Sequence, residues 1–241
     1  MIAESTTVMP DLTLYGGRDP RDAPRYSFPE AARATGIPVS TLRAWTVGQR
    51  YRRKDDLGFF EPVLQRPNAS DNRLSFFNLI EAHVLRALRT VHDVDLGKVR
   101  YAIQLAEQDL GTTRLLLDRR LKTAGGTLFF DRYTELLELS PSQQIAMRTI
   151  LDAYMQRVAY DDSKLPAEFF PFEHVPENAD RKVIVIAPFI SFGRAILRRT
   201  GVSTRAIVQR LDAGETLADL LNDYGLTEAE LEEAVLFEAA A

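Results

Sequence analysis

The sequence YSFPEAARATGIPVSTLRAW, residues Tyr26–Trp45, is the clearest structural signal in this chain of 241 residues. Ser27 and Glu30 stand three residues apart, which is the spacing of a capping box at the start of a helix. An alanine-rich run follows and favours that helix. Gly36 stands where a helix ends in the left-handed conformation, and Pro38 is suited to open a second helix. Two helices joined by a short turn that contains glycine predict a helix-turn-helix.

The second helix of this pair is the element expected to enter the major groove of DNA. Leu42 is expected to face the first helix, with Trp45 or Ala44 beside it, so the polar side chains of the second helix point away. These side chains are hydroxyls and a guanidinium, which can bond to base edges and phosphates. The predicted reading residues are Ser40, Thr41 and Arg43.

A wing is expected directly after the helix-turn-helix. The sequence predicts a strand at Gly58–Gln65, a polar turn at Arg66–Asn72 and a second short strand at Arg73–Ser75. Four cations also stand in five residues from Arg50. Cations on a wing raise affinity by releasing counterions from the sugar-phosphate backbone, without selecting a sequence. The basic residues expected to contact DNA are Arg50, Arg52, Arg53, Lys54, Arg66 and Arg73.

Composition indicates a globular protein with one large domain or two small ones. Cysteine is absent, which excludes disulfides, thiol catalysis and cysteine-based zinc sites, and is consistent with a reducing cytoplasm. There is no run of 18 apolar residues and no signal-peptide pattern. The net charge of −4 hides a split. Residues 1–120 carry 18 Lys and Arg against 15 Asp and Glu, whereas residues 121–241 carry 12 against 19, which suggests two functional ends.

Motifs of common enzymes do not occur in the sequence. It has no Gly-x-x-x-x-Gly-Lys, no His-Glu-x-x-His and no Gly-x-Ser-x-Gly. The histidines His83, His92 and His174 stand far apart, so nothing local pairs a serine with a base. We therefore expect no catalytic residues, no metal ligands and no cofactor.

The predicted order of helix-turn-helix, wing and two further helices resembles the DNA-binding domain of MerR-type regulators, over about Tyr26–Leu110. The resemblance implies a DNA-binding role for this region. The residues that carry it are Ala31-Ala32, Thr35–Ile37, Ser40–Trp45, Arg73–Phe76 and Leu96–Val99.

The fold class predicted for the whole chain is mainly α with small β elements. Short strands are expected at Leu128–Phe130, Arg157–Tyr160 and Ala167–Phe170, with a helix that starts at Ser140. The predicted divisions are a flexible lead-in (1–24), a MerR-like winged helix-turn-helix domain (25–122), a small α+β unit (123–172), a linker (173–181) and a C-terminal three-helical interaction domain (182–241).

The tail begins with a predicted strand at Lys182–Pro188, and helices are expected from Ser203, Thr216 and Thr227. It resembles a small bacterial domain of uncharacterised function that is often encoded beside PIN-type ribonucleases. Arg199-Thr200-Gly201 replaces the usual Gly-Thr-Arg of that family. The matching pieces are Pro188, Gly193-Arg194, Ile196–Arg198, Ala213–Leu217 and Tyr224–Glu228.

Both halves together resemble a VapB-type antitoxin of a toxin–antitoxin pair. The resemblance implies a protein that binds operator DNA to control its own operon and neutralises a PIN-type ribonuclease by direct contact. Because one helix-turn-helix reads only a few base pairs, a homodimer on two half-sites is expected.

The tail is expected to contact protein rather than DNA. Its last helix carries five glutamates and no cation, and carboxylates repel phosphates. Guanidinium groups before it can pair with the acidic active site of a toxin, or alternatively with the glutamates of the tail itself. The predicted toxin-binding residues are Arg194, Arg198, Arg199 and Arg205.

Two other functions are compatible with the sequence. The chain could be an effector-responsive transcription regulator whose middle unit binds a small ligand, or an interaction scaffold whose helix-turn-helix units only pack. Aromatic residues of the middle unit could line the ligand pocket, although such residues more often belong to a core. They are Phe129, Phe130, Phe169, Phe170 and Phe172.

Overall fold

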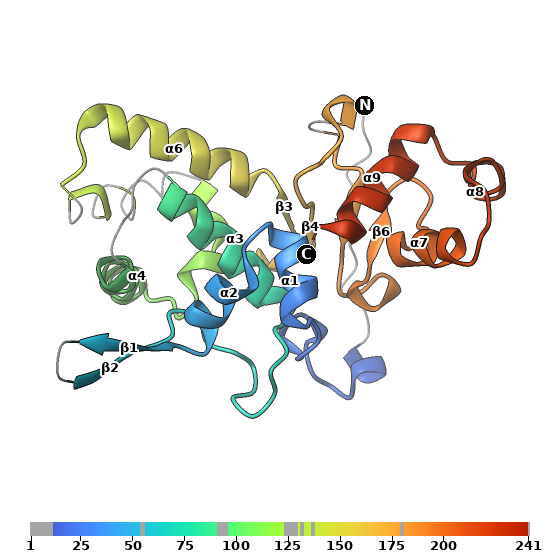
Figure 1. The fold of residues 1–241 in the computed structure, drawn as a ribbon. Coiled ribbons are helices and arrows are strands. Elements are labelled where there is room, and N and C mark those ends of the chain that lie inside the picture. Colours follow the sequence, from blue (N-terminus) through green and yellow to red (C-terminus); the bar gives the residue numbers. More distant parts are fainter. Residues whose placement is uncertain are drawn as a thin grey trace.

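The computed structural model describes residues 12–53, 56–90, 96–122, 130, 133–135, 138–178 and 181–240. Within these residues the protein is mainly helical, with a two-stranded ribbon and a four-stranded sheet, as predicted. Figure 1 shows the helix-turn-helix against a central helix, with the tail helices at the opposite end of the molecule from the ribbon. None of the described helices is long and apolar enough to cross a membrane.

The helix-turn-helix forms as the sequence predicts. α1 covers Phe28–Thr35 and α2 covers Val39–Thr46. Both hydrogen bonds of the capping box between Ser27 and Glu30 are present, and Gly36 ends α1 with φ of 64°. Leu42 is completely buried, so α2 packs with its polar side chains facing outward. The predicted boundaries follow from these local caps and are confirmed.

The wing forms earlier in the chain than predicted. β1 (Gln49–Arg53) pairs with β2 (Asp56–Phe60) in an antiparallel ribbon. The predicted strand at Gly58–Gln65 is therefore wrong beyond Phe60, and Arg73–Ser75 is no partner strand, because Leu74 forms an isolated bridge with Tyr26 instead. As a result, Arg50, Arg52 and Arg53 of the basic run lie in the ribbon itself.

The central helix α3 (Phe76–Thr90) supports the helix-turn-helix on one side and α6 (Pro141–Met155) on another. α4 (Leu96–Leu110) follows it along the chain. His83 is fully buried in α3, and burial lowers its pKa to about 3, so the ring is neutral at pH 7. Its Nε2 lies 3.0 Å from the carbonyl oxygen of Tyr154, which places His83 in the core.

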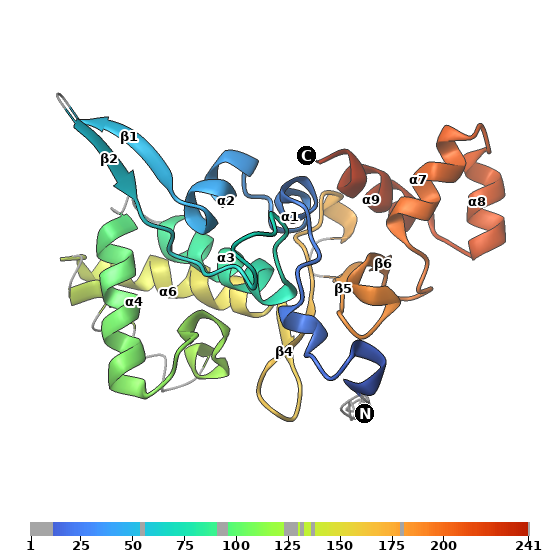
Figure 2. The same ribbon diagram turned by 90° about the horizontal axis from the view of Figure 1, so that it is seen from below.

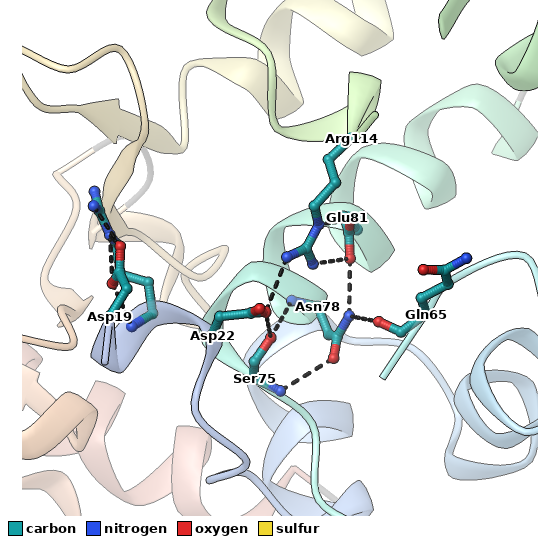
Figure 3. A network of polar contacts seen from close by, with 8 residues as sticks. Asp19, Asp22, Gln65, Ser75, Asn78, Glu81 and Arg114 are labelled. Carbon is teal, nitrogen blue, oxygen red and sulfur yellow. Dashed lines mark hydrogen bonds and ion pairs between the residues drawn. The ribbon is translucent and has the colours of Figure 1, made fainter. Parts of the chain in front are cut away.

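A polar network fixes the start of α3 to three other segments (Figure 3). Ser75 and Asn78 cap the helix, and Asn78 Nδ2 donates to the carbonyl oxygen of Gln65 at 2.8 Å. Arg114 donates to both oxygens of Glu81, at 2.8 and 2.9 Å, and to Asp22 at 2.9 Å. Arg114 follows α4 and lies in the segment that includes the 3-10 turns η3 (Leu115–Leu117) and η4 (Arg119–Lys122). The network therefore fixes the position of the segment that follows the wing.

The predicted flexible lead-in is ordered where the structure describes it. It contains the 3-10 turns η1 (Leu12–Tyr15) and η2 (Pro20–Asp22). The side chain of Arg21 is only 1% exposed and donates to Asp161 at 2.6 Å and to Asp19 at 2.7 Å. The prediction is wrong for residues 12–24 because this buried ion pair attaches them to the middle of the chain, and residues 1–11 lie outside the described residues.

The four-stranded antiparallel sheet has the order β3 (Val158–Tyr160), β4 (Pro166–Phe169), β5 (Ile184–Ile186) and β6 (Ala195–Leu197). The strands predicted around 157–160, 167–170 and 182–188 are confirmed. Of the strand predicted at Leu128–Phe130, residues 128 and 129 lie outside the described residues, and Phe130 is helical.

The sheet joins strands from both sides of the predicted linker 173–181. Within that segment η5 covers Pro176–Asn178, and Asn178 Nδ2 donates to the carbonyl oxygen of Ala229 at 2.8 Å. The predicted domain limits remain predictions, but this segment is bound to the tail.

Three helices complete the tail: α7 (Thr204–Asp212), α8 (Leu217–Tyr224) and α9 (Glu228–Ala239). The 3-10 turn η6 (Ser191–Gly193) connects β5 and β6 before them. Capping boxes start α8 at Thr216 and α9 at Thr227, which confirms the predicted caps. Apolar side chains from all three helices are buried together, including Ile207, Leu220, Leu231 and Phe237.

Candidate nucleic-acid interface

The outer side of α2 is open to solvent. Ser40 and Arg43 are exposed, and Thr41 is half-buried. The guanidinium carbon of Arg43 lies 5.0 Å from the centre of the Phe28 ring, a contact that orients the side chain without covering it. The structure therefore presents all three predicted reading residues on one accessible helix.

The β1–β2 ribbon places two arginines on one of its faces. Arg50 is opposite Phe59 and Arg52 is opposite Leu57, and residues two apart on a strand point to the same side. Both arginines are exposed. Arg53 ends β1, but its side chain and all of Lys54 lie outside the described residues. The ribbon is thus a cationic strand pair, which suits contact with phosphates.

The ribbon is fixed at its base. Arg100 of α4 lies over the ring of Phe60, with its guanidinium carbon 4.9 Å from the ring centre, and donates to the carbonyl oxygen of Glu61. Further out, the ring of Tyr51 covers Gly58, where a β-carbon would lie 2.5 Å from the ring. These contacts orient the ribbon relative to the helices.

The side chains of Arg66 and Arg73 are both engaged in hydrogen bonds within the protein. Arg66 donates to the carbonyl oxygens of Asp71, Ala69 and Thr46 at 2.6, 3.0 and 3.3 Å. It therefore closes the loop after the ribbon onto the end of α2. Arg73 pairs with Asp71 at 2.7 Å, and its hydrogen bonds lower the pKa of that carboxyl to about 2.

The four arginines predicted to bind a toxin fall on two surfaces. Arg199 pairs with Glu230 at 2.6 Å and donates to the carbonyl oxygen of Gly225. For this arginine, the structure therefore shows the alternative prediction, which is an ion pair with a glutamate of the tail. Arg198 is exposed, with its guanidinium carbon 5.3 Å from the centre of the Phe170 ring. Arg194 and Arg205 instead line a cavity of about 810 Å³ between α1 and α7.

The acidic last helix is largely neutralised inside the protein. Glu233 is 1% exposed and accepts hydrogen bonds from the backbone N–H groups of His174 and Val175 at 2.8 and 2.9 Å. Glu238 accepts from Arg33 and from Thr204, both at 2.5 Å. Glu230 is paired with Arg199, so three of the five glutamates of the last helix are bound within the protein. Glu228 and Glu232 are the exposed pair.

The aromatic residues of the middle unit belong mostly to the core. Phe130, Phe169 and Phe170 are buried, and Phe172 is the more exposed member of the set. Phe129 lies outside the described residues. Among the described residues, no group of three or more His, Asp or Glu side chains is placed to hold a metal ion.

Comparisons with known proteins match both ends of the chain. Residues 24–103 match the family described as "Putative DNA-binding HTH domain". Residues 184–237 match the family described as "Protein of unknown function (DUF433)". The chain therefore carries a helix-turn-helix module followed by a tail of the uncharacterised family, which is the arrangement that the sequence predicts.

One relative shares this arrangement over nearly its whole length. The chain is 28% identical over 229 residues to "Putative antitoxin VapB45" of Mycobacterium tuberculosis (strain ATCC 25618 / H37Rv), which covers 89% of this chain and 93% of the relative. The fold also matches the X-ray crystal structure of Rv2018 from Mycobacterium tuberculosis, with a TM-score of 0.66 and 24% identity, over 89% of this chain and 98% of that one. The chain is therefore similar over most of its length to a protein described as a putative antitoxin, in agreement with the resemblance predicted from the sequence.

Proposed function

We propose that this protein is the antitoxin of a type II toxin–antitoxin module. In this proposal it binds operator DNA through α2 and the β1–β2 ribbon, represses its own operon, and neutralises a PIN-type ribonuclease by direct contact in the cytoplasm. The carrying observation is that α2 and the ribbon lie along one edge of the molecule (Figure 2) and that Ser40, Arg43, Arg50 and Arg52 on these elements are exposed. A homologue described as an antitoxin supports the toxin part.

The division of roles within the interface follows from chemistry. Arg43 is proposed to contact a base edge, with Ser40 and Thr41 beside it, because a recognition helix reads bases in the major groove. Arg50 and Arg52, together with Arg53 and Lys54, are proposed to contact phosphates. Arg66 is left out of the proposed contacts because the carbonyl groups of its own loop occupy it.

A homodimer is proposed as the binding species. One helix-turn-helix contacts a few base pairs, and dimers read two half-sites one helical turn apart. The complex with operator DNA should accordingly contain two protomers. The protein is proposed to act by binding alone, without enzymatic activity.

Arg43→Ala is expected to reduce the preference for operator over unrelated DNA by roughly 1–3 kcal/mol, because a bidentate base contact is lost. The measurement is binding of the purified protein to a duplex from upstream of its own gene and to a scrambled duplex. Arg52→Ala is the matched control, since losing a phosphate contact weakens both duplexes alike and reduces the salt slope by about 0.9. An Arg43→Ala protein that keeps its full preference for the operator would contradict the reading role.

Arg198→Ala with Arg199→Ala is expected to weaken inhibition of the toxin while operator binding stays unchanged. The two guanidinium groups follow β6 on the tail, away from the proposed DNA contacts, and can pair bidentately with carboxylates. The measurement is the ribonuclease activity of a PIN-type protein encoded next to the gene, assayed with each antitoxin variant.

Arg198→Ala alone separates recognition from tail stability, because Arg199 also pairs with Glu230. Inhibition that stays complete in the double variant would exclude these residues from the toxin contact.

A second candidate function, a MerR-like regulator that responds to a small ligand, would require a pocket in the middle unit. The burial of Phe169 and Phe170 in the core favours the antitoxin.

A further inference from the structure

A polar groove lies between the helix-turn-helix and the tail. It has a volume of about 810 Å³ and is bounded by α1, the start of α7 and the turn before β6. Arginines from separate segments of the chain gather along it. They are Arg25, Arg33 and Arg73 from the N-terminal half, and Arg194 and Arg205 from the tail.

The two walls of the groove are joined by direct bonds. The hydroxyl of Tyr26 donates to the carbonyl oxygen of Gly193 at 2.9 Å. Gly193 has φ of 71°, and a β-carbon there would lie 2.4 Å from that hydroxyl. At the other end, Arg33 pairs with Glu238 at 2.5 Å. The spacing between the walls is therefore set by the fold and does not depend on a bound partner.

The positive charge of the groove is only partly compensated. Arg33 is paired with Glu238, and Arg73 with Asp71. Arg194 and Arg205 are exposed, and neither takes part in an ion pair within the described part of the chain. Two further carboxylates line the groove: Glu30 is engaged in the capping box of α1, and Asp212 lies at the end of α7. The groove thus presents two guanidinium groups of the tail, Arg194 and Arg205, toward solvent.

We propose that this groove binds the phosphodiester backbone of the same DNA duplex that α2 reads, so that the tail contributes to operator binding. This inference rests on the proposed function. α1 forms one wall of the groove and also holds α2, so a duplex seated on α2 passes next to it. In Figure 2 the ribbon, α2 and α7 lie along the same upper edge of the molecule.

Position favours DNA over an acidic protein segment as the occupant, because the groove adjoins α1, the helix that packs against α2. Phosphate contacts need cations that are accessible from solvent, and both Arg194 and Arg205 are exposed. The acidic helix α9 opposes the contact less than its five glutamates suggest, because Glu230, Glu233 and Glu238 are each bound within the protein. Of the glutamates of this helix, only Glu228 and Glu232 are exposed.

The test compares Arg194→Ala with Arg205→Ala, as a double variant, against a charge-matched double variant, Arg18→Ala with Arg181→Ala. The control residues are exposed arginines outside the groove. Binding to the upstream duplex and to a scrambled duplex is measured between 50 and 200 mM salt. Circular dichroism verifies that both variants are folded.

The groove variant is expected to bind both duplexes more weakly and to lose about 1.8 from the salt slope, since each phosphate contact contributes about 0.9. Between 50 and 200 mM salt, the fold-loss of affinity should therefore be about twelve times larger for the wild type than for the groove variant. The control variant should keep the wild-type slope.

An unchanged slope in the groove variant, with Arg43→Ala still losing operator preference, would overturn the groove proposal and leave the proposed function standing. The same holds if the groove variant loses only toxin inhibition, which would make the groove a protein site. A wild-type protein that binds neither duplex would instead contradict the proposed function itself.

Discussion

Trp45→Ala is expected to lower the free energy of unfolding by about 3–5 kcal/mol and to abolish operator binding. Trp45 is 3% exposed, and its carbonyl oxygen accepts hydrogen bonds from the N–H groups of Val63 and Leu64 at 2.8 and 2.9 Å. The guanidinium carbon of Arg89 lies 5.6 Å from its ring centre. The backbone bonds remain in the alanine variant, but removing the buried ring leaves a cavity in the core on which the recognition helix packs.

Unfolding by urea, followed by circular dichroism, measures the stability loss, and a DNA titration measures binding. Tryptophan fluorescence cannot follow this variant because the chain has a single tryptophan. Val47→Ala is the control, since Val47 lies at the end of the same helix with 41% of its surface exposed and should change stability by less than about 0.5 kcal/mol. Equal stability of the two variants would show that the helix-turn-helix does not depend on this ring.

Glu233→Ala is expected to destabilise the protein by about 3–5 kcal/mol, because it leaves buried donors without an acceptor. The carboxylate accepts hydrogen bonds from the backbone N–H groups of His174 and Val175, and one of its oxygens lies 2.9 Å from the ring Nδ1 of His174. These bonds attach α9 to the segment that connects β4 and β5. Without them α9 should detach from that segment.

The control for this variant is the adjacent exposed glutamate, Glu232→Ala, which removes the same charge and should change stability by less than about 0.5 kcal/mol. Urea unfolding and hydrogen exchange at the tail amides measure the difference. If the two variants unfolded at the same urea concentration, Glu233 would carry no structural role.

Much of the fold could be predicted from the sequence. The starts of α1, α6, α8 and α9 could be predicted, because each helix begins with a capping box at the residue where the sequence indicates a start. The wing was misplaced because β1 reads QRYRR and lacks the alternation of apolar and polar residues that marks a half-buried strand. A ribbon that is exposed on both faces gives no such signal.

The candidate site was predicted in part. The residues on α2 were found because Leu42 fixes which side of the helix faces inward. In the sequence, Arg66 cannot be told apart from the arginines of the ribbon. Only its hydrogen bonds to three carbonyl groups show that its guanidinium group is already engaged. The groove arginines could not be grouped in advance, since Arg25 and Arg205 lie far apart in the chain.

The starts of the helices and the polar side of the second helix could be predicted locally, because caps and periodicity act between residues three or four positions apart. Which charges remain available to a partner depends instead on how distant parts of the chain pack. Arg21 meets Asp161 across 140 residues, and Arg33 meets Glu238 across 205. Such pairs depend on how distant segments pack, and each one removes from the surface a charge that the sequence shows as free.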